Sequence, residues 1–178
     1  MSGEKYFLEA WLSKGVYKPE FFEPADISHA HITFIRPFTI SEGNEADVRE
    51  KIIGYCKGKK PIPFVITGKG NFDDEINYIP VSGAEIEEFD GGIEALLTNE
   101  VQFAKKLGDK KILHLTITTA RQNSFPKTDL FMLRLTCIRD KRVWFSFDFT
   151  TQEILNREES LDEVRWINTC NIFQSKKE

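Results

Sequence analysis

The sequence predicts an α+β fold built from two related lobes, and three features support this prediction. Each half contains one stretch with apolar residues at helical spacing, together with several short runs typical of β-strands. No part of the chain is arranged for the repeated parallel crossovers of an α/β sheet. The tetrapeptide His-Ile-Thr-Phe at 31–34 returns 83 residues later as His-Leu-Thr-Ile at 114–117. A pseudo-twofold relation between the halves would bring these two motifs face to face.

The first part of the chain is expected to contain two strands and a helix. Residues 6–12 are typical of a β-strand, and the run 30–35 carries the first motif. This second strand is expected to stop at Pro37, which has no backbone N–H. From 44 to 56 the apolar residues follow helical spacing, with acidic residues in the first turn, where they suit the helix dipole. Gly58 is expected to end that helix.

The middle of the chain is expected to hold two short strands and a second helix. The β-like runs 62–67 and 76–81 are separated by the Gly-containing segment 68–74. Its Gly-x-Gly is too short and too poorly placed for a dinucleotide fingerprint, so it indicates a turn. The apolar stripe over 86–97 predicts an amphipathic helix, although Gly91-Gly92 weakens the helix propensity in its middle.

After the second motif the pattern returns to strands. The runs 130–138 and 143–149 are expected to form a β-hairpin, since four polar residues join them and the second run alternates apolar with polar or aromatic side chains. Beyond 152 we expect a short helix, and residues 171–178 are expected to form a polar tail. The whole chain, 1–178, is interpreted as a single domain made of two lobes.

Charge and composition limit the partners. The net charge is −4 and the isoelectric point is about 5.5, so the chain lacks the positive field that holds long duplex DNA. A short ligand or a terminal phosphate remains compatible with this charge. No apolar run is long enough to cross a membrane, and the N-terminus lacks the layout of a signal peptide. We therefore expect a cytoplasmic monomer with no membrane contact.

The three cysteines are not expected to form a disulfide framework or a metal site. Cys56, Cys137 and Cys170 are widely separated and odd in number, which argues against a disulfide framework, and no Cys-x-x-Cys metal spacing is present. Cys137 lies in an apolar stretch and Cys56 closes a helical stripe. Both are predicted to be small buried hydrophobic residues.

The spacing within each motif has a direct geometric meaning. In an extended strand residues i and i+2 point to the same face, about 6.5 Å apart. His31 and Thr33 therefore share one face of their strand, and His114 and Thr116 share one face of theirs. The apolar residues between and beside them point to the opposite face, into a core. Each motif is predicted to present an imidazole and a hydroxyl from a rigid element.

Two imidazoles with ordinary pKa values near 6.5 can divide proton transfer at neutral pH. If a phosphorus atom lies between them, one histidine can take a proton from an attacking water while the other protonates the departing ribose oxygen. Hydroxyls such as those of Thr33 and Thr116 can hold the nonbridging phosphate oxygens. Arg36 and Arg121, which follow the two motifs closely, are candidates for additional positive charge.

With these four positions the chain resembles the 2H phosphoesterase superfamily, which is named for two His-x-Thr/Ser motifs. This superfamily includes the RNA 2',3'-cyclic phosphodiesterases long called 2'-5' RNA ligases. The resemblance is carried by His31, Thr33, His114 and Thr116, while the order of elements from about 5 to 155 is compatible with it. The second motif continues as Thr-Thr-Ala before Arg121, so the arginine that many relatives carry soon after the motif is displaced here.

The resemblance implies a bilobal fold in which two pseudo-symmetric antiparallel sheets with outer helices surround a central cleft. It also implies a phosphodiesterase that acts on cyclic or linear phosphodiesters of nucleotides and RNA ends, without metal or cofactor. The histidines would be the acid and the base, and the threonines would bind phosphate. Which histidine has which role stays open. Phe72 and Tyr78, between the lobes, are candidates for stacking on a base.

Three other interpretations remain. His29-Ala30-His31 could begin a metal site, although no acid or cysteine at suitable spacing completes it and the second motif would be unexplained. The threonines could be ordinary strand residues and the histidines partly buried structural residues, but that interpretation does not predict the recurrence. Finally, the same cleft could bind a nucleotide or RNA end without turning it over.

Overall fold

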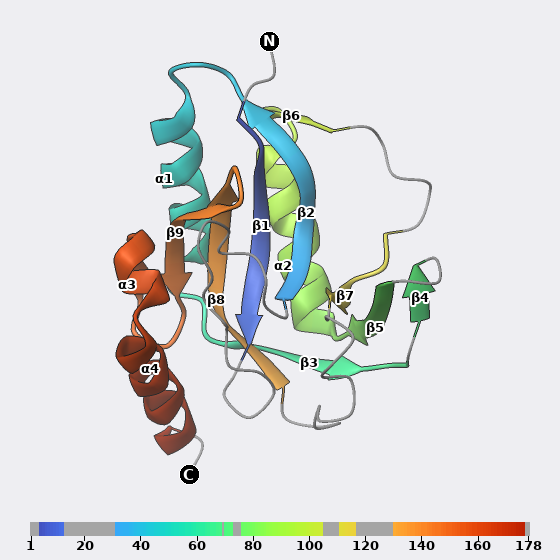
Figure 1. The fold of residues 1–178 in the computed structure, drawn as a ribbon, viewed down its shortest axis with the longest axis vertical. Coiled ribbons are helices and arrows are strands. Elements are labelled where there is room, and N and C mark those ends of the chain that lie inside the picture. Colours follow the sequence, from blue (N-terminus) through green and yellow to red (C-terminus); the bar gives the residue numbers. More distant parts are fainter. Residues whose placement is uncertain are drawn as a thin grey trace.

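The structure is a computed structural model that describes residues 4–12, 31–68, 70–72, 76–104, 111–116 and 130–176 (Figure 1). It confirms the predicted α+β class. The described residues form four helices, which are α1 (Glu45–Cys56), α2 (Ala84–Leu97), α3 (Arg157–Leu161) and α4 (Glu163–Ser175). They also form ten strands, which are β1 (Tyr6–Leu12), β2 (His31–Ile40), β3 (Ile62–Ile66), β4 (Gly70–Phe72), β5 (Ile76–Ser82), β6 (Val101–Phe103), β7 (His114–Thr116), β8 (Leu130–Arg139), β9 (Arg142–Asp148) and β10 (Glu153–Leu155).

Six strands close into an antiparallel ring, which brings both halves of the chain into one continuous sheet. The order is β1-β2-β7-β5-β3-β8, and β8 pairs again with β1. Strands β9 and β10 extend the sheet beyond β8, while β4 pairs with β5 and β6 pairs with β2. The two strands that begin at the histidines of the motifs, β2 and β7, are neighbours in this ring.

The two faces of β1 pack against different helices. The side chains of Tyr6, Leu8, Ala10 and Leu12 belong to the larger core, which also contains the buried residues of α1 and α2. Trp11 belongs to a smaller cluster with Trp166 and Cys170 of α4. Figure 1 shows α4 and α3 on the β9 side of the molecule, well away from α2. The alternation along β1 therefore places α1 and α2 on one face and α4 on the other.

The expectation that the second strand ends at Pro37 is wrong. Strand β2 continues to Ile40, and its register with β1 shifts between the Leu8–Ile35 and Tyr6–Phe38 pairs, so that β2 spans one more residue than β1. Pro37 lies in this irregularity, where the ladder does not need its missing N–H. Its carbonyl instead accepts a hydrogen bond of 2.7 Å from the backbone N–H of Ala104.

Other elements agree with or refine the predictions. The helix from 44 to 56 and the hairpin are confirmed, and the hairpin turn is reduced to Asp140 and Lys141, whose positive φ angles of 44° and 67° suit a tight two-residue connection. The Gly91-Gly92 pair does not interrupt α2. The expected tail 171–178 is instead helical as far as Ser175, where α4 ends.

Cysteine burial follows the prediction. Cys56 and Cys137 are buried as expected, Cys170 is buried as well, and all three are free of disulfides. Among the helices of the described residues, none is both long and apolar enough to cross a membrane.

Candidate active site

The two His-x-Thr motifs lie side by side on β2 and β7. In this antiparallel pair His31 is the register partner of Thr116, and Ile32 is the partner of Leu115. The next position of the same register sets Thr33 beside His114. A local twofold axis therefore passes between Ile32 and Leu115 and relates one motif to the other. Ile32 and Leu115 are fully buried in the larger core, so the four motif positions occupy the opposite face of the strands.

The two histidines are diagonal neighbours across this strand pair. Diagonal positions in an antiparallel pair are about 7–8 Å apart, which leaves room for a small group held between two side chains. His31 is close enough to lower the pKa of His114 by charge repulsion. Both imidazoles are partly buried. The register thus brings together the two titratable groups that the sequence analysis singled out.

His114 is held by the backbone of its own strand segment. Its Nδ1 lies 2.8 Å from the carbonyl oxygen of Ile112. A carbonyl only accepts hydrogen bonds, so Nδ1 carries the hydrogen and, in the neutral ring, Nε2 is the atom that can take up a proton. The pKa of His114 is lowered chiefly by burial and further by His31, and the hydrogen bond to Ile112 opposes this change. A histidine in this state is suited to act as a general base.

His31 lies next to a buried carboxylate. Nδ1 of His31 is 3.5 Å from Oε2 of Glu9, and the Glu9 side chain is completely buried. The other oxygen of Glu9, Oε1, accepts a hydrogen bond of 2.8 Å from the indole N–H of Trp11. Glu9 is the register partner of Thr33 on β2, so it lies on the face of β1 that continues the motif face. The first motif therefore has a buried acidic neighbour on β1.

Glu9 and Trp11 were not singled out by the sequence analysis. A signal was present, because Glu9 is a charged residue between Leu8 and Ala10 in the middle of a strand that is apolar on both faces. Lone carboxylates rarely occupy such positions unless they have a partner. Sequence alone could not have shown that this partner is a histidine from another strand.

The other predicted site residues have different outcomes. Tyr78 of β5 is the register partner of Thr116, so its backbone borders the motif, while Phe72 of β4 pairs with Ile76, farther along β5. The backbone of Arg36 belongs to β2, within the same strand as the first motif. Arg121 and His29 lie outside the described residues. In the described segments, no group of three His, Cys, Asp or Glu side chains is arranged to hold a metal ion.

A hollow of about 530 Å³ opens beside the segment that leads into β7. Its charged lining residues are Glu87, Asp90 and Lys111, and Lys111 Nζ is 2.5 Å from Asp90 Oδ1 and 3.4 Å from Glu94 Oε2. Burial raises the pKa of Asp90, against the opposing effect of Lys111. The lysine is thus engaged by carboxylates, and the charge of this hollow does not favour a phosphate.

Comparison with known proteins gives no assignment: no protein-family model matches the chain, and no curated protein matches it.

Proposed function

We propose that this protein is a metal-independent phosphodiesterase of the 2H phosphoesterase type, which hydrolyses 2',3'-cyclic phosphates of nucleotides or RNA ends. The observation that supports this proposal most strongly is the antiparallel register of β2 and β7. It pairs His31 with Thr116 and relates two His-x-Thr motifs from opposite halves of the chain by a local twofold axis. A structural role for each threonine and histidine does not account for both the recurrence and this pairing.

The reaction proposed is an in-line displacement at phosphorus. A water oxygen forms a bond to the phosphorus and loses a proton to one histidine. The bond from phosphorus to one ribose oxygen breaks, and that oxygen takes a proton from the other histidine. The hydroxyls of Thr33 and Thr116 are proposed to hold the nonbridging oxygens while charge shifts. The product is a phosphomonoester on the ribose oxygen that keeps the phosphate.

The finer fold assignment belongs to the same proposal. We interpret the two halves as the two lobes of a 2H-type fold that meet at β2 and β7, with α1 and α2 as the outer helices. Arg36 and Arg121 are proposed as additional phosphate contacts, and Phe72 and Tyr78 as residues that stack on a base. The protein is proposed to act as a cytoplasmic monomer on nucleotides or RNA termini.

The direct test is to incubate the purified protein with each of the four 2',3'-cyclic mononucleotides in excess chelator. We expect conversion to a phosphomonoester, and ³¹P NMR identifies whether the 2' or the 3' oxygen keeps the phosphate. Binding measured by calorimetry without any conversion would identify a non-catalytic nucleotide-binding module instead. Turnover lost to chelator and restored by zinc would support the metal interpretation and overturn the proposal.

A further inference from the structure

We propose that Asp90 and Lys111 are positioning residues for His114, because their ion pair holds the segment 111–113, whose backbone orients the imidazole. The inference rests on the proposed function for its effect on catalysis. Its structural part, the orientation of one imidazole through an ion pair made elsewhere on the chain, can be measured without a substrate.

The segment that leads into β7 is held at both of its ends. At one end, Lys111 Nζ lies 2.5 Å from Asp90 Oδ1 on α2. At the other end, the side chain of Leu113 is buried in the larger core. The carbonyl of Leu113 also accepts a hydrogen bond of 2.9 Å from the backbone N–H of Val81 on β5. Each residue has only two soft backbone dihedrals, so the peptide units between these two anchors have little freedom to rotate.

Ile112 lies between the two anchors and makes the contact to His114. Its carbonyl oxygen is 2.8 Å from Nδ1 of the imidazole. The side chain of Ile112 is 44% exposed, so its own packing fixes this backbone only weakly. The position of the carbonyl oxygen therefore depends on Lys111 on one side and Leu113 on the other. The ion pair thus determines, through one peptide unit, how the imidazole is oriented.

This contact selects one orientation and one neutral tautomer of the His114 ring. A carbonyl oxygen only accepts hydrogen bonds, so Nδ1 keeps the hydrogen and Nε2 carries the lone pair. In the proposed reaction, Nε2 is then the ring nitrogen that exchanges a proton with water or with the ribose oxygen. Proton transfer requires hydrogen-bonding distance, so a ring that turns away from the site loses rate even in an intact fold.

The surroundings of Asp90 make this anchor firm. Asp90 is only 8% exposed, although it is an acidic residue in the middle of α2. Burial raises its pKa, and the hydrogen bond and the charge of Lys111 act in the opposite direction. Glu94, one helical turn farther along α2, lies 3.4 Å from the same ammonium group. Lys111 is therefore bound by two carboxylates, one of them buried, and is held more firmly than a lysine in a single exposed pair.

The decisive variant is Lys111→Met, which keeps most of the aliphatic stem and removes the ammonium group. Long-range ¹H–¹⁵N NMR spectra report which ring nitrogen of His114 carries the hydrogen at a pH where the ring is neutral. We expect the hydrogen on Nδ1 in the wild type and a mixture of both tautomers in Lys111→Met. Lys111→Arg keeps a cation and should retain the wild-type spectrum of His114. Loss of a merely stabilising ion pair would not change this tautomer.

The same variant has an expected effect on catalysis. For a 2',3'-cyclic mononucleotide, kcat of Lys111→Met should fall about 10- to 100-fold, because a misplacement of about 1 Å in a reacting group can cost about 10²-fold. KM should stay near the wild-type value, since the ion pair is not part of the proposed phosphate contacts. Lys111→Arg should recover most of the lost kcat.

A double variant separates positioning from stability. Lys111→Met alone leaves the carboxylate of Asp90 buried without its cation, which can destabilise the fold. The double variant Asp90→Ala/Lys111→Ala removes both charges and places a strong helix former in α2. We expect it to fold and to show the same mixture of His114 tautomers. Retention of the wild-type tautomer in the folded double variant would overturn the inference.

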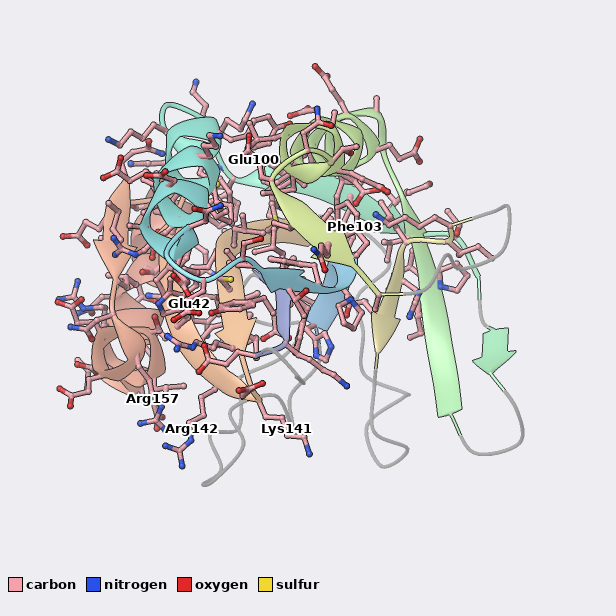
Figure 2. All side chains as sticks on the ribbon, turned by 90° about the horizontal axis from the view of Figure 1, so that it is seen from above. Glu42, Glu100, Phe103, Lys141, Arg142 and Arg157 are labelled. Atoms are coloured by element: carbon pink, nitrogen blue, oxygen red, sulfur yellow. The ribbon has the colours of Figure 1, made fainter. Side chains whose placement is uncertain are left out.

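Lys51→Met is the matched control. Lys51 of α1 lies 2.5 Å from Glu100 Oε1, the same distance as in the Lys111–Asp90 pair, and the two lysine side chains are 43% and 37% exposed. Figure 2 shows Glu100 beside α1 at the start of β6. This control should leave kcat and the His114 tautomer unchanged. An equal change in Lys51→Met, or no change in Lys111→Met, would overturn the inference. If Lys111→Met changes the tautomer but the wild type hydrolyses no cyclic nucleotide, the proposed function fails and the positioning of His114 remains.

Discussion

His31 on β2 and Thr116 on β7 are antiparallel register partners, although one belongs to the first motif and the other to the second. This pairing makes the histidine of each motif a neighbour of the threonine position of the other. In the proposed reaction, a phosphate centred on the local axis would lie beside one His-x-Thr motif from each strand. Five predictions, each specific to named residues, test the proposed activity and the packing of the fold.

The first prediction concerns the two motif histidines. His31→Ala and His114→Ala are each expected to lower kcat for a 2',3'-cyclic mononucleotide by about 10²- to 10⁴-fold, because each removes one partner in proton transfer. His29→Ala is the matched control, since it removes a histidine adjacent to the first motif but outside it, and its turnover should stay near the wild-type value. Unchanged turnover in both motif variants would defeat the assignment of the site.

The second prediction concerns pH. Because the pKa of His114 is lowered, first by burial and then by His31, its imidazole stays neutral below the ordinary imidazole pKa of about 6.5 and is suited to be the base of the proposed reaction. Activity should be retained through pH 6.5 and lost as the pH falls through the pKa of His114. The unfolded chain binds this proton at higher pH than the folded chain does. The free energy of unfolding should therefore also decrease as the pH falls below about 6.5.

The pH profile of kcat/KM and urea unfolding across the same range measure these two effects. In His114→Ala, the part of the pH dependence that is due to His114 should disappear from kcat/KM and from the free energy of unfolding. An acidic limb centred above pH 6.5 in the wild type would contradict this prediction.

The third prediction concerns the hydroxyl of Thr33. Thr33→Val keeps the shape of the side chain and is expected to lower kcat about 10- to 100-fold, because a donor to the phosphate is lost. Thr33→Ser keeps the hydroxyl and should recover most of the activity. Thr39→Val, farther along β2 and also half-buried, is the control and should leave kcat unchanged. Equal activities of the valine and serine variants of Thr33 would exclude a role for the hydroxyl.

The fourth prediction concerns two adjacent glycines in α2. A Cβ on Gly92 would overlap the hydroxyl of Tyr55 from α1, which donates a hydrogen bond of 3.2 Å to the carbonyl of Phe89. Gly92→Ala is therefore expected to destabilise the fold by about 1–3 kcal/mol. A Cβ on Gly91 meets no atom within 4 Å, so Gly91→Ala should stabilise it by up to about 1 kcal/mol. Chemical denaturation measures the free energy of unfolding of both variants. Equal changes in Gly91→Ala and Gly92→Ala would contradict this account of how α1 packs against α2.

The fifth prediction concerns the buried ion pair under the C-terminal helices. Arg134 is fully buried and donates to Asp148 Oδ2 at 2.9 Å, to the Ser160 carbonyl at 3.2 Å and to Thr169 Oγ1 at 3.1 Å. Arg134→Leu leaves the carboxylate of Asp148 buried without its cation, and is expected to cost about 3–5 kcal/mol. Arg165, whose ion pair with Glu153 is exposed, is the control, and Arg165→Leu should cost less than about 1 kcal/mol. Similar unfolding midpoints for Arg134→Leu and Arg165→Leu would contradict the prediction.

Local patterns predicted most elements because their causes are local. The strand-like composition of 6–12 and the helical spacing of 44–56 are each properties of a single element, and both elements occur where expected. The prediction failed at Pro37, since a proline stops a regular ladder but is accommodated where the register with β1 shifts. Beyond 171, α4 continues to Ser175, although its last turn is exposed.

The sequence by itself determined that His31 and Thr33 share a face, as do His114 and Thr116, because a strand repeats every two residues. Only the tertiary structure decided that the two strands are neighbours and in which register they pair. It also decided that a carboxylate from β1 reaches His31 and a backbone carbonyl reaches His114. These contacts join residues distant in the chain or depend on the exact path of the backbone. Local spacing carries no information about them, and so only the folded chain distinguishes the two histidines chemically.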